Sequence, residues 1–380
     1  MSEMVTKSSS LRRATAGAGP ACVPTDEATP RKSISIVSAC RNEQEYIRAF
    51  VDSLLAQDLA GFDWEIILAD GASSDGTREI LFELASSNPN IVVIDNPARI
   101  VSTGLNAAIL AARGDIILRM DAHTEYGKDY VRRCVQTLET SGAENVGGPA
   151  RTKAEGARAR AIQAAYHSRF STGGARFHDD NYTGYVDTVT YGCWRKETLR
   201  KLGMFDEGLV RNQDDELNLR LIRSGGKIWQ SSEIVSWYRP RATLSALFRQ
   251  YFQYGFWKVR VIRKHKIPGS WRHLVTGTFE MANLLLFLVA VVAAMAGDQS
   301  LSHRGIAGWA GLLAVYCVAV LAASCVSAYR FGWGLLPYLP LTFSTFHISY
   351  GTGFLLGSVY WTFARAGDSR LGNLFVGVTR

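Results

Sequence analysis

The last third of this 380-residue chain constrains its structure most, because it holds three long apolar runs. Residues 275–296 contain a single charged side chain, and residues 305–328 and 331–363 contain no Asp, Glu, Lys or Arg. A helix that crosses a bilayer needs roughly 20 such residues. The first two runs therefore each predict one membrane-spanning helix. The third run, interrupted by two prolines, predicts an interfacial half-helix followed by a span, or two short passes. Buried helical core is the alternative for all three.

A basic stretch with interleaved aromatic residues precedes these runs. Residues 239–273 contain nine Lys or Arg and no Asp or Glu. Beside a span, this composition predicts helices that lie on the lipids of an anionic inner leaflet. Segments beside membrane spans that are rich in Lys and Arg usually lie on the cytoplasmic side. The basic stretch therefore also predicts a multi-pass protein of the inner membrane whose preceding domain faces the cytoplasm. Nucleic-acid binding is the weaker alternative, because no nucleic-acid motif accompanies the patch, and we expect no such partner.

The rest of the composition argues against two classes of protein. The six cysteines include no Cys-x-x-Cys pair, which argues against a disulfide framework or a zinc knuckle. Residues 1–32 are rich in small and polar side chains and lack a continuous apolar core. We therefore expect a disordered tail there and not a signal peptide.

Between the tail and the basic stretch, short apolar runs alternate with amphipathic runs, which is typical of an α/β fold with a parallel sheet. Ligands of such sheets bind beyond the carboxyl ends of the strands. Three strand ends carry polar groups: Asn42 and Glu43, then Asp70, then Asp121 and His123. They predict a ligand site at this edge. The expected strands are 34–39, 64–70, 91–96 and 115–121, and the expected helices are 43–57, 77–87 and 102–114.

Asp121 and His123 are separated by one residue, so a continuing strand would place both on one side. A hard divalent ion accepts carboxylate oxygen, tolerates imidazole and commonly completes its shell with phosphate oxygens. A metal there would stabilise the charge of a departing diphosphate. The alternative is a solvated turn without a ligand.

Two further acidic positions are candidates for chemistry. Asp70 opens a polar turn, and its carboxylate can accept hydrogen bonds from a nucleobase or a ribose, although turn aspartates also serve only as caps. Residues 214–216 begin a helix expected within 211–227. The helix dipole favours acidic groups there in any case, while the functional interpretation makes one of them a general base. No G-x-G-x-x-G follows the first strand, which argues against a dinucleotide oxidoreductase.

Five stretches, in this order, resemble inverting family 2 glycosyltransferases with the GT-A fold. They are "ISIVSACRNEQEYI", "ILADGASSDGT", "GLNAAILAARGDIILRMDAH", "GMFDEGL" and "NQDDELNLRLIRSGG". The resemblance spans roughly residues 33–260, and residues 238–258 with the apolar tail resemble the branch of succinoglycan and exopolysaccharide biosynthesis. It implies a Rossmann-like mixed α/β sheet flanked by helices and followed by C-terminal transmembrane helices.

The resemblance also implies roles by position. Ser38, Asn42 and Glu43 would line the nucleotide cleft, and Asp70 would hold the uracil or the ribose. Ala69 stands where many members of the family have a further aspartate.

The remaining implied roles concern the diphosphate and the acceptor. Asp121 and His123 stand where the family's Asp-x-Asp motif binds a metal ion and the diphosphate of the nucleotide sugar. Asp214 matches the aspartate of the family's Glu-Asp pair, which is the catalytic base. His123 departs from the second Asp of the first motif, and Gln213 departs from the Glu of the second.

The resemblance implies an enzyme that uses Mg²⁺ or Mn²⁺ and moves a sugar from a UDP-sugar, with glucose as the expected sugar. The acceptor would be a hydroxyl of a polyprenyl-diphosphate-linked saccharide, and other exopolysaccharide-assembly proteins would be partners. The alternatives are a polyprenyl-phosphate sugar synthase and a non-catalytic nucleotide-sugar-binding assembly subunit. The expected organisation is a tail at 1–32, the GT-A domain at 33–238, basic aromatic interfacial helices at 239–274, three or four transmembrane helices at 275–365, and a C-terminal tail at 366–380.

Overall fold

The structure is a computed structural model that describes residues 31–363. Of the two expected tails, positions 31 and 32 are described, and Lys32 already opens the first strand. The other residues of the two tails, 1–30 and 366–380, lie outside the described part of the chain.

An eight-stranded sheet organises the first two thirds of the described chain, in the order β3-β2-β1-β4-β9-β6-β10-β8. The first four strands along the chain are mutually parallel, whereas β9 is antiparallel to both β4 and β6. This arrangement confirms the predicted mixed α/β sheet. The strands are β1 (Lys32–Cys40), β2 (Phe62–Asp70), β3 (Ile91–Asp95), β4 (Ile116–Arg119), β6 (Asn145–Gly148), β8 (Gly184–Val186), β9 (Thr190–Arg195) and β10 (Ile228–Gln230).

Apolar residues of the central strands alternate between the two faces of the sheet. Ile34 and Ile36 of β1 belong to one core cluster, and Val37 belongs to the other. Helices α1, α2 and α4 cover the first face, and α3, α7 and α8 cover the second. The helices are α1 (Ile47–Leu55), α2 (Thr77–Ser87), α3 (Val101–Ala111), α4 (Tyr130–Thr140), α5 (Ala157–Tyr166), α6 (Arg169–Thr172), α7 (Lys196–Leu202) and α8 (Gln213–Arg223), with a 3₁₀ turn η1 at Arg176–His178.

A second, smaller sheet lies beyond the end of β4. Strand β11 (Ser236–Tyr238) pairs antiparallel with β5 (Thr124–Tyr126) and parallel with β7 (Arg151–Thr152). The segment that leaves β4 therefore turns into this sheet directly after Asp121 and His123. This turn fixes where the two side chains lie.

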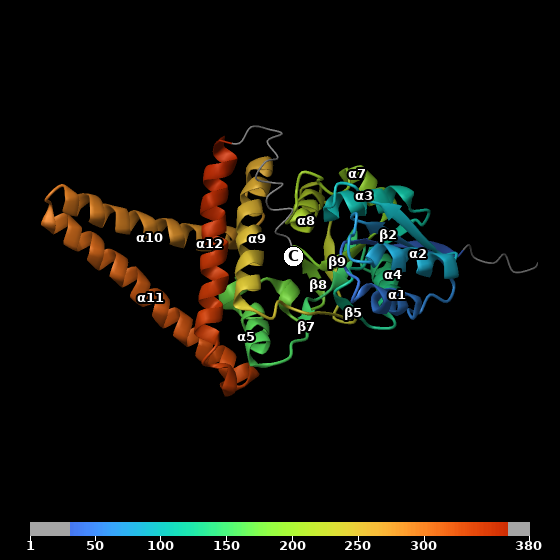
Figure 1. Cartoon of the computed structure of the whole chain (residues 1–380), viewed down its shortest axis with the longest axis horizontal. Coiled ribbons are helices and arrows are strands. Elements are labelled where there is room, and N and C mark those ends of the chain that lie inside the picture. Colours follow the sequence, from blue (N-terminus) through green and yellow to red (C-terminus); the bar gives the residue numbers. More distant parts are fainter. Residues whose placement is uncertain (1–30, 364–380) are drawn as a thin grey trace, which may run out of the picture. The chain divides into compact units, whose positions relative to one another are not determined.

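Helix α9 (Leu244–His265) packs along α12 (Leu339–Phe363), and Figure 1 shows the two side by side. Glycines bring the two backbones together. A Cβ added at Gly255 would lie 2.1 Å from the carbonyl oxygen of Tyr350, and one at Gly353 would lie 2.1 Å from that of Phe252. Any side chain at either position would force these helices apart.

Helices α10 (Arg272–Met295) and α11 (Gln299–Phe331) form an antiparallel hairpin (Figure 1). Both are long and apolar enough to cross a membrane, judged by length and composition. Their large apolar side chains are extensively exposed, as at Leu285 (54 %) and Val318 (67 %). Exposed apolar surface of this kind marks a membrane or a protein interface.

The third apolar run forms neither a half-helix followed by a span nor two short passes, the two arrangements that its prolines suggested. It forms a short 3₁₀ turn, η2 (Trp333–Leu335), and then the single long helix α12. Pro340 falls at the second residue of α12, in the first turn, where its missing N–H leaves no intrahelical bond unmade. The expected basic aromatic region is mainly α9, whose Phe256, Trp257 and Lys258 are buried.

Candidate active site

One large cavity opens at the carboxyl ends of β1 and β4. Its volume is about 1510 Å³, and its wall runs from Asn42 and Glu43 past Asp121, His123 and Asp214 to the helices α9, α10 and α12. Five of the seven side chains to which the resemblance assigns roles thus share one cavity. Ser38 and Asp70 do not line it.

Arg119, the last residue of β4, joins two of these carboxylates. Its Nε and Nη2 donate to the two carboxylate oxygens of Asp121 at 2.9 and 2.7 Å, and its Nη1 donates to Asp214 Oδ2 at 3.2 Å. Burial disfavours its charge, but Asp121 and Asp214 outweigh that effect and raise the pKa of Arg119. A permanent cation therefore lies between the two acidic side chains.

Sequence reasoning missed Arg119, although the signal was present. It is the one charged residue inside the apolar run at 116–120, and a charged side chain in a buried strand needs a partner. The predicted strand also extended to Asp121, whereas β4 ends at Arg119. Asp121 and His123 therefore lie in a turn and contact different neighbours.

His123 pairs with Glu43 and not with Asp121. Its Nε2 lies 2.9 Å from Glu43 Oε2, and its ring makes an edge contact with Tyr46 at 5.2 Å between centroids. Glu43 is only 3 % exposed, and its backbone N–H donates to Thr77 Oγ1 at 2.7 Å. The start of α2 thus helps to hold Glu43 against the imidazole.

The donor set for a metal ion is small. Across residues 31–363 no three His, Cys, Asp or Glu side chains are arranged to hold a metal. Mg²⁺, however, is usually held by one or two carboxylates together with substrate phosphates and water. Asp121 and His123 both line the cavity, so they could take part in holding an ion that is bound jointly with a diphosphate.

Asp70 and Ser38 are buried beneath the cavity edge. The Asp70 carboxylate accepts from Arg78 Nη1 at 2.9 Å and from the backbone N–H of Ser73 at 3.2 Å. Ser38 is fully buried, and its Oγ has no hydrogen-bond partner within the described residues. Asn42 does line the cavity, and its Oδ1 accepts from the backbone N–H of Ser74 at 2.9 Å. In this structure Asp70 holds the turn after β2 through Arg78 and Ser73.

The first turn of α8 presents three consecutive acidic residues that have different surroundings. Asp214 is 43 % exposed at the side chain and contacts Arg119. Asp215 pairs with Lys258 of α9, whose Nζ lies 2.6 Å from its Oδ2. Burial raises the pKa of Asp215, but Lys258, together with His273 and Arg272 of α10, outweighs it and keeps that pKa below its ordinary value.

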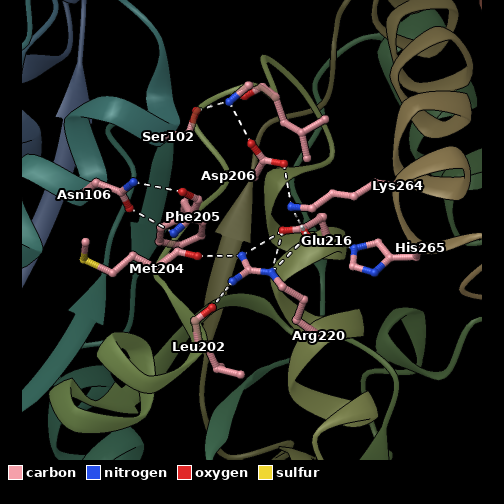
Figure 2. A network of polar contacts seen from close by, with 12 residues as sticks. Ser102, Asn106, Leu202, Met204, Phe205, Asp206, Glu216, Arg220, Lys264 and His265 are labelled. Atoms are coloured by element: carbon pink, nitrogen blue, oxygen red, sulfur yellow. Dashed lines mark hydrogen bonds and ion pairs between the residues drawn. The ribbon is translucent and has the colours of Figure 1, made fainter. Parts of the chain in front are cut away.

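Glu216, the third of these residues, is fully buried and does not line the cavity. Arg220, Lys264 and His265 lie 2.8, 2.8 and 2.9 Å from its carboxylate oxygens (Figure 2). Burial raises the pKa of Glu216, but the hydrogen bonds from Arg220 and Lys264 outweigh it and lower that pKa overall. Glu216 therefore anchors α8 to α9, and Asp214 is the acid of this turn that is best placed to act in the cavity.

The loop before α8 is held by the same network, as Figure 2 shows. Lys264 also pairs with Asp206 at 2.7 Å, and Asn106 of α3 exchanges two 2.9 Å hydrogen bonds with the backbone of Phe205. Ser102 donates to the carbonyl of Leu209 at 2.9 Å. These contacts fix the "GMFDEGL" stretch and with it the position of Asp214.

Known proteins are similar to this chain in sequence and in fold. Residues 35–202 match the family model described as Glycosyl transferase family 2. The chain is 32 % identical over 341 residues to the succinoglycan biosynthesis protein ExoA of Rhizobium meliloti (strain 1021), an alignment that covers 87 % of this chain and 96 % of that protein.

Two more distant proteins extend the similarity. One is the dolichyl N-acetyl-alpha-D-glucosaminyl phosphate 3-beta-D-2,3-diacetamido-2,3-dideoxy-beta-D-glucuronosyltransferase of Methanococcus voltae, which is 25 % identical over 86 % of this chain and 97 % of its own length. The other is a solved structure, the mannosyltransferase PcManGT from Pyrobaculum calidifontis in complex with GDP-Man and Mn²⁺. It superposes with a TM-score of 0.55 over 86 % of this chain and 88 % of its own, at 17 % identity. At 17 % identity this likeness concerns the fold alone.

Proposed function

Because the chain belongs to glycosyl transferase family 2, we propose that this glycosyltransferase moves a glucosyl residue from UDP-glucose, or a close relative of it, to a hydroxyl of a polyprenyl-diphosphate-linked saccharide. The observation that carries the proposal is the single cavity in which Arg119 joins Asp121 to Asp214. A transferase of this kind needs an anion-stabilising group for its leaving diphosphate and a base for its acceptor. This cavity holds candidates for both.

In the proposed mechanism Asp121 would hold Mg²⁺ or Mn²⁺ together with the donor diphosphate, and the bound ion would supply positive charge that stabilises the leaving UDP. Arg119 adds a fixed positive charge beside it. Asn42, Glu43 and His123 form the wall of the cavity on the nucleotide side. Ser38 and Asp70 would act from beneath that wall, Asp70 by holding the turn after β2.

Asp214 is the proposed general base. Its carboxylate takes the proton from the acceptor hydroxyl as that oxygen attacks the anomeric carbon from the face opposite UDP. An α-linked donor therefore gives a β-linked product. Holding both substrates in one cavity removes much of the entropic cost of bringing them together.

Membrane attachment is part of the proposal. Helices α10 and α11 satisfy the length and apolarity of membrane spans, and we propose that they anchor the enzyme in the inner membrane with its catalytic domain in the cytoplasm. The positive charges of 239–273 favour that orientation. The similarity to a succinoglycan biosynthesis protein supports a role in exopolysaccharide assembly, beside other proteins of that process.

The test is release of UDP by the purified full-length protein, measured over a panel of nucleotide sugars with bacterial lipid extract, with and without Mn²⁺. We expect release that depends on one UDP-sugar, on the lipid extract and on Mn²⁺. Asp214→Asn should lower the rate about a hundredfold or more, because general base catalysis typically contributes 10²–10⁴-fold.

The same assay distinguishes the competing acceptor. A polyprenyl-phosphate sugar synthase uses a lipid phosphate that needs no strong base, so Asp214→Asn would then cost little activity. If no nucleotide sugar in the panel yields UDP with lipid extract, the proposed donor and acceptor are both wrong.

A further inference from the structure

The cavity is larger than one substrate requires. Its volume of about 1510 Å³ exceeds the roughly 300–1,000 Å³ of most small-molecule pockets. Beyond Asp214 its wall leaves the sheet and continues onto the C-terminal helices. We call this part the helical end; it is lined by Arg211, Lys258, Arg272, His273, Phe346 and Tyr350.

Cations are built into the helical end. Lys258 is only 4 % exposed and pairs with Asp215 at 2.6 Å, and Arg272 pairs with Asp187. Burial lowers the pKa of Arg211, the third cation. These cations lie in the cavity wall beside Asp187, Asp214 and Asp215. An anion in the cavity would add a further partner for this buried positive charge.

His273 adds an unsatisfied polar atom to the same wall. Its Nδ1 is buried and has no hydrogen-bond partner in the described part of the chain. Its backbone carbonyl accepts from the hydroxyl of Tyr350 at 3.2 Å, so the residue lies where α10 meets α12. Buried polar atoms are normally paired, and a phosphate oxygen in the cavity would provide the partner for an N–H at Nδ1.

The wall of the helical end becomes apolar toward α12. Phe346 lines the cavity, and α10 leaves Leu284, Leu285 and Phe287 about half exposed on its outer surface. Leu284 lies roughly 18 Å along α10 from Arg272, by the rise of a helix. A ligand with an anionic group at the cations and an extended hydrocarbon chain would therefore reach this apolar surface further along α10. We infer that the helical end binds the phosphates of an amphiphilic acceptor, whose hydrocarbon chain follows α10 and α12; this rests on the proposed function, for which it names the acceptor subsite.

The inference is tested by direct binding to the full-length protein in detergent. The probe is farnesyl diphosphate, measured by fluorescence or thermophoresis in saturating UDP and Mn²⁺, so that the nucleotide side of the cavity is filled. Inorganic diphosphate and farnesol are the two comparison ligands. We expect farnesyl diphosphate to bind at least about tenfold more tightly than either, since only it engages both the cations and the apolar wall.

Two variants locate the site, and a third is the matched control. Arg272→Gln and Lys258→Gln should each weaken farnesyl diphosphate about tenfold and leave the affinity for UDP within about twofold. Arg263→Gln removes the same charge from an exposed position of α9 that does not line the cavity, and it should change neither affinity. Unchanged UDP binding shows that each variant is folded.

The outcomes separate this inference from the proposed function. If inorganic diphosphate binds as tightly as farnesyl diphosphate, the site binds free phosphate. If farnesol binds as tightly, the site is an apolar pocket. If both variants keep the wild-type affinity for farnesyl diphosphate, the lipid binds elsewhere. Each result overturns the inference while UDP release in lipid extract still stands. Loss of UDP release with farnesyl diphosphate binding intact would instead refute the proposed function.

Discussion

Replacing Arg119 with methionine tests the central contact of the cavity. The side chain makes two hydrogen bonds to Asp121, at 2.9 and 2.7 Å, and one to Asp214 at 3.2 Å. Removing one partner of a buried ion pair typically costs about 3–5 kcal/mol. The carboxylates are 31 % and 43 % exposed and can regain water, so we expect a loss of about 2 kcal/mol in the free energy of unfolding.

Arg119→Met should lower kcat/KM but raise the affinity of the enzyme for Mn²⁺. Without its tether Asp214 loses its fixed position, and kcat/KM should fall about a hundredfold, as small misplacements of catalytic groups can cause. Asp121 regains two free oxygens and loses a neighbouring cation. A metal ion then no longer displaces a charge-assisted hydrogen bond, so the half-saturating concentration of Mn²⁺ should fall about tenfold.

The assay is UDP release by the full-length enzyme over a Mn²⁺ titration, with thermal unfolding measured on the same samples. Arg119→Lys keeps the positive charge but not the paired N–H donors of the guanidinium, and its half-saturating concentration of Mn²⁺ should stay close to that of the wild type. Arg113→Met is the matched control, because its side chain is 77 % exposed and pairs with Glu65 away from the cavity. A half-saturating Mn²⁺ concentration that is unchanged or raised in Arg119→Met would refute the idea that Arg119 and the metal share Asp121.

Three further predictions concern stability and the membrane. Glu216→Gln should lower the free energy of unfolding by about 3 kcal/mol in denaturant titration, because it breaks a buried charge network. Folding lowers the pKa of Glu216. The contribution of Glu216 to the free energy of unfolding should therefore be complete above the ordinary pKa of glutamate and be lost as the pH falls through the folded pKa. A wild-type unfolding midpoint that does not change with pH over this range, and that equals the midpoint of Glu216→Gln, would contradict this. Gly255→Leu should abolish folded protein or lower Tm strongly, because its Cβ meets a backbone oxygen at 2.1 Å, whereas Gly311→Ala, with nothing within 4 Å, should be neutral. The full chain should stay in the membrane pellet after alkaline carbonate washing; its release would argue against α10 and α11 as spans.

The sheet was predictable where burial on both faces left a continuous apolar run. β1, β2 and β3 begin and end within about two residues of their predicted limits, and α2 coincides with its predicted range. The later strands escaped prediction for a physical reason. β6 reads Asn-Val-Gly-Gly, and β7 has two residues, so long-range pairing and not local pattern makes them strands.

The site was predictable as a set of strand-end carboxylates but not as a set of contacts. That parallel strands end at one edge is enough to bring Asn42, Glu43 and Asp121 together. No spacing rule states that Arg119 would take both oxygens of Asp121, or that His123 would turn to Glu43. Such choices depend on the turn into β5, which is set by pairing with β11, more than 100 residues further along the chain.

The three acidic residues in the first turn of α8 are equivalent in the sequence, and only their contacts in the structure distinguish their roles. Successive helical residues point about 100° apart, so 214, 215 and 216 must face three different surroundings. Asp214 meets Arg119 at the sheet, while Asp215 and Glu216 meet Lys258 and Lys264 of α9. Two neighbours of the proposed base are thus bound to the helix that packs on α12. A displacement of α9 would pull on the turn that carries Asp214, so the position of the base depends on the packing of the C-terminal helices.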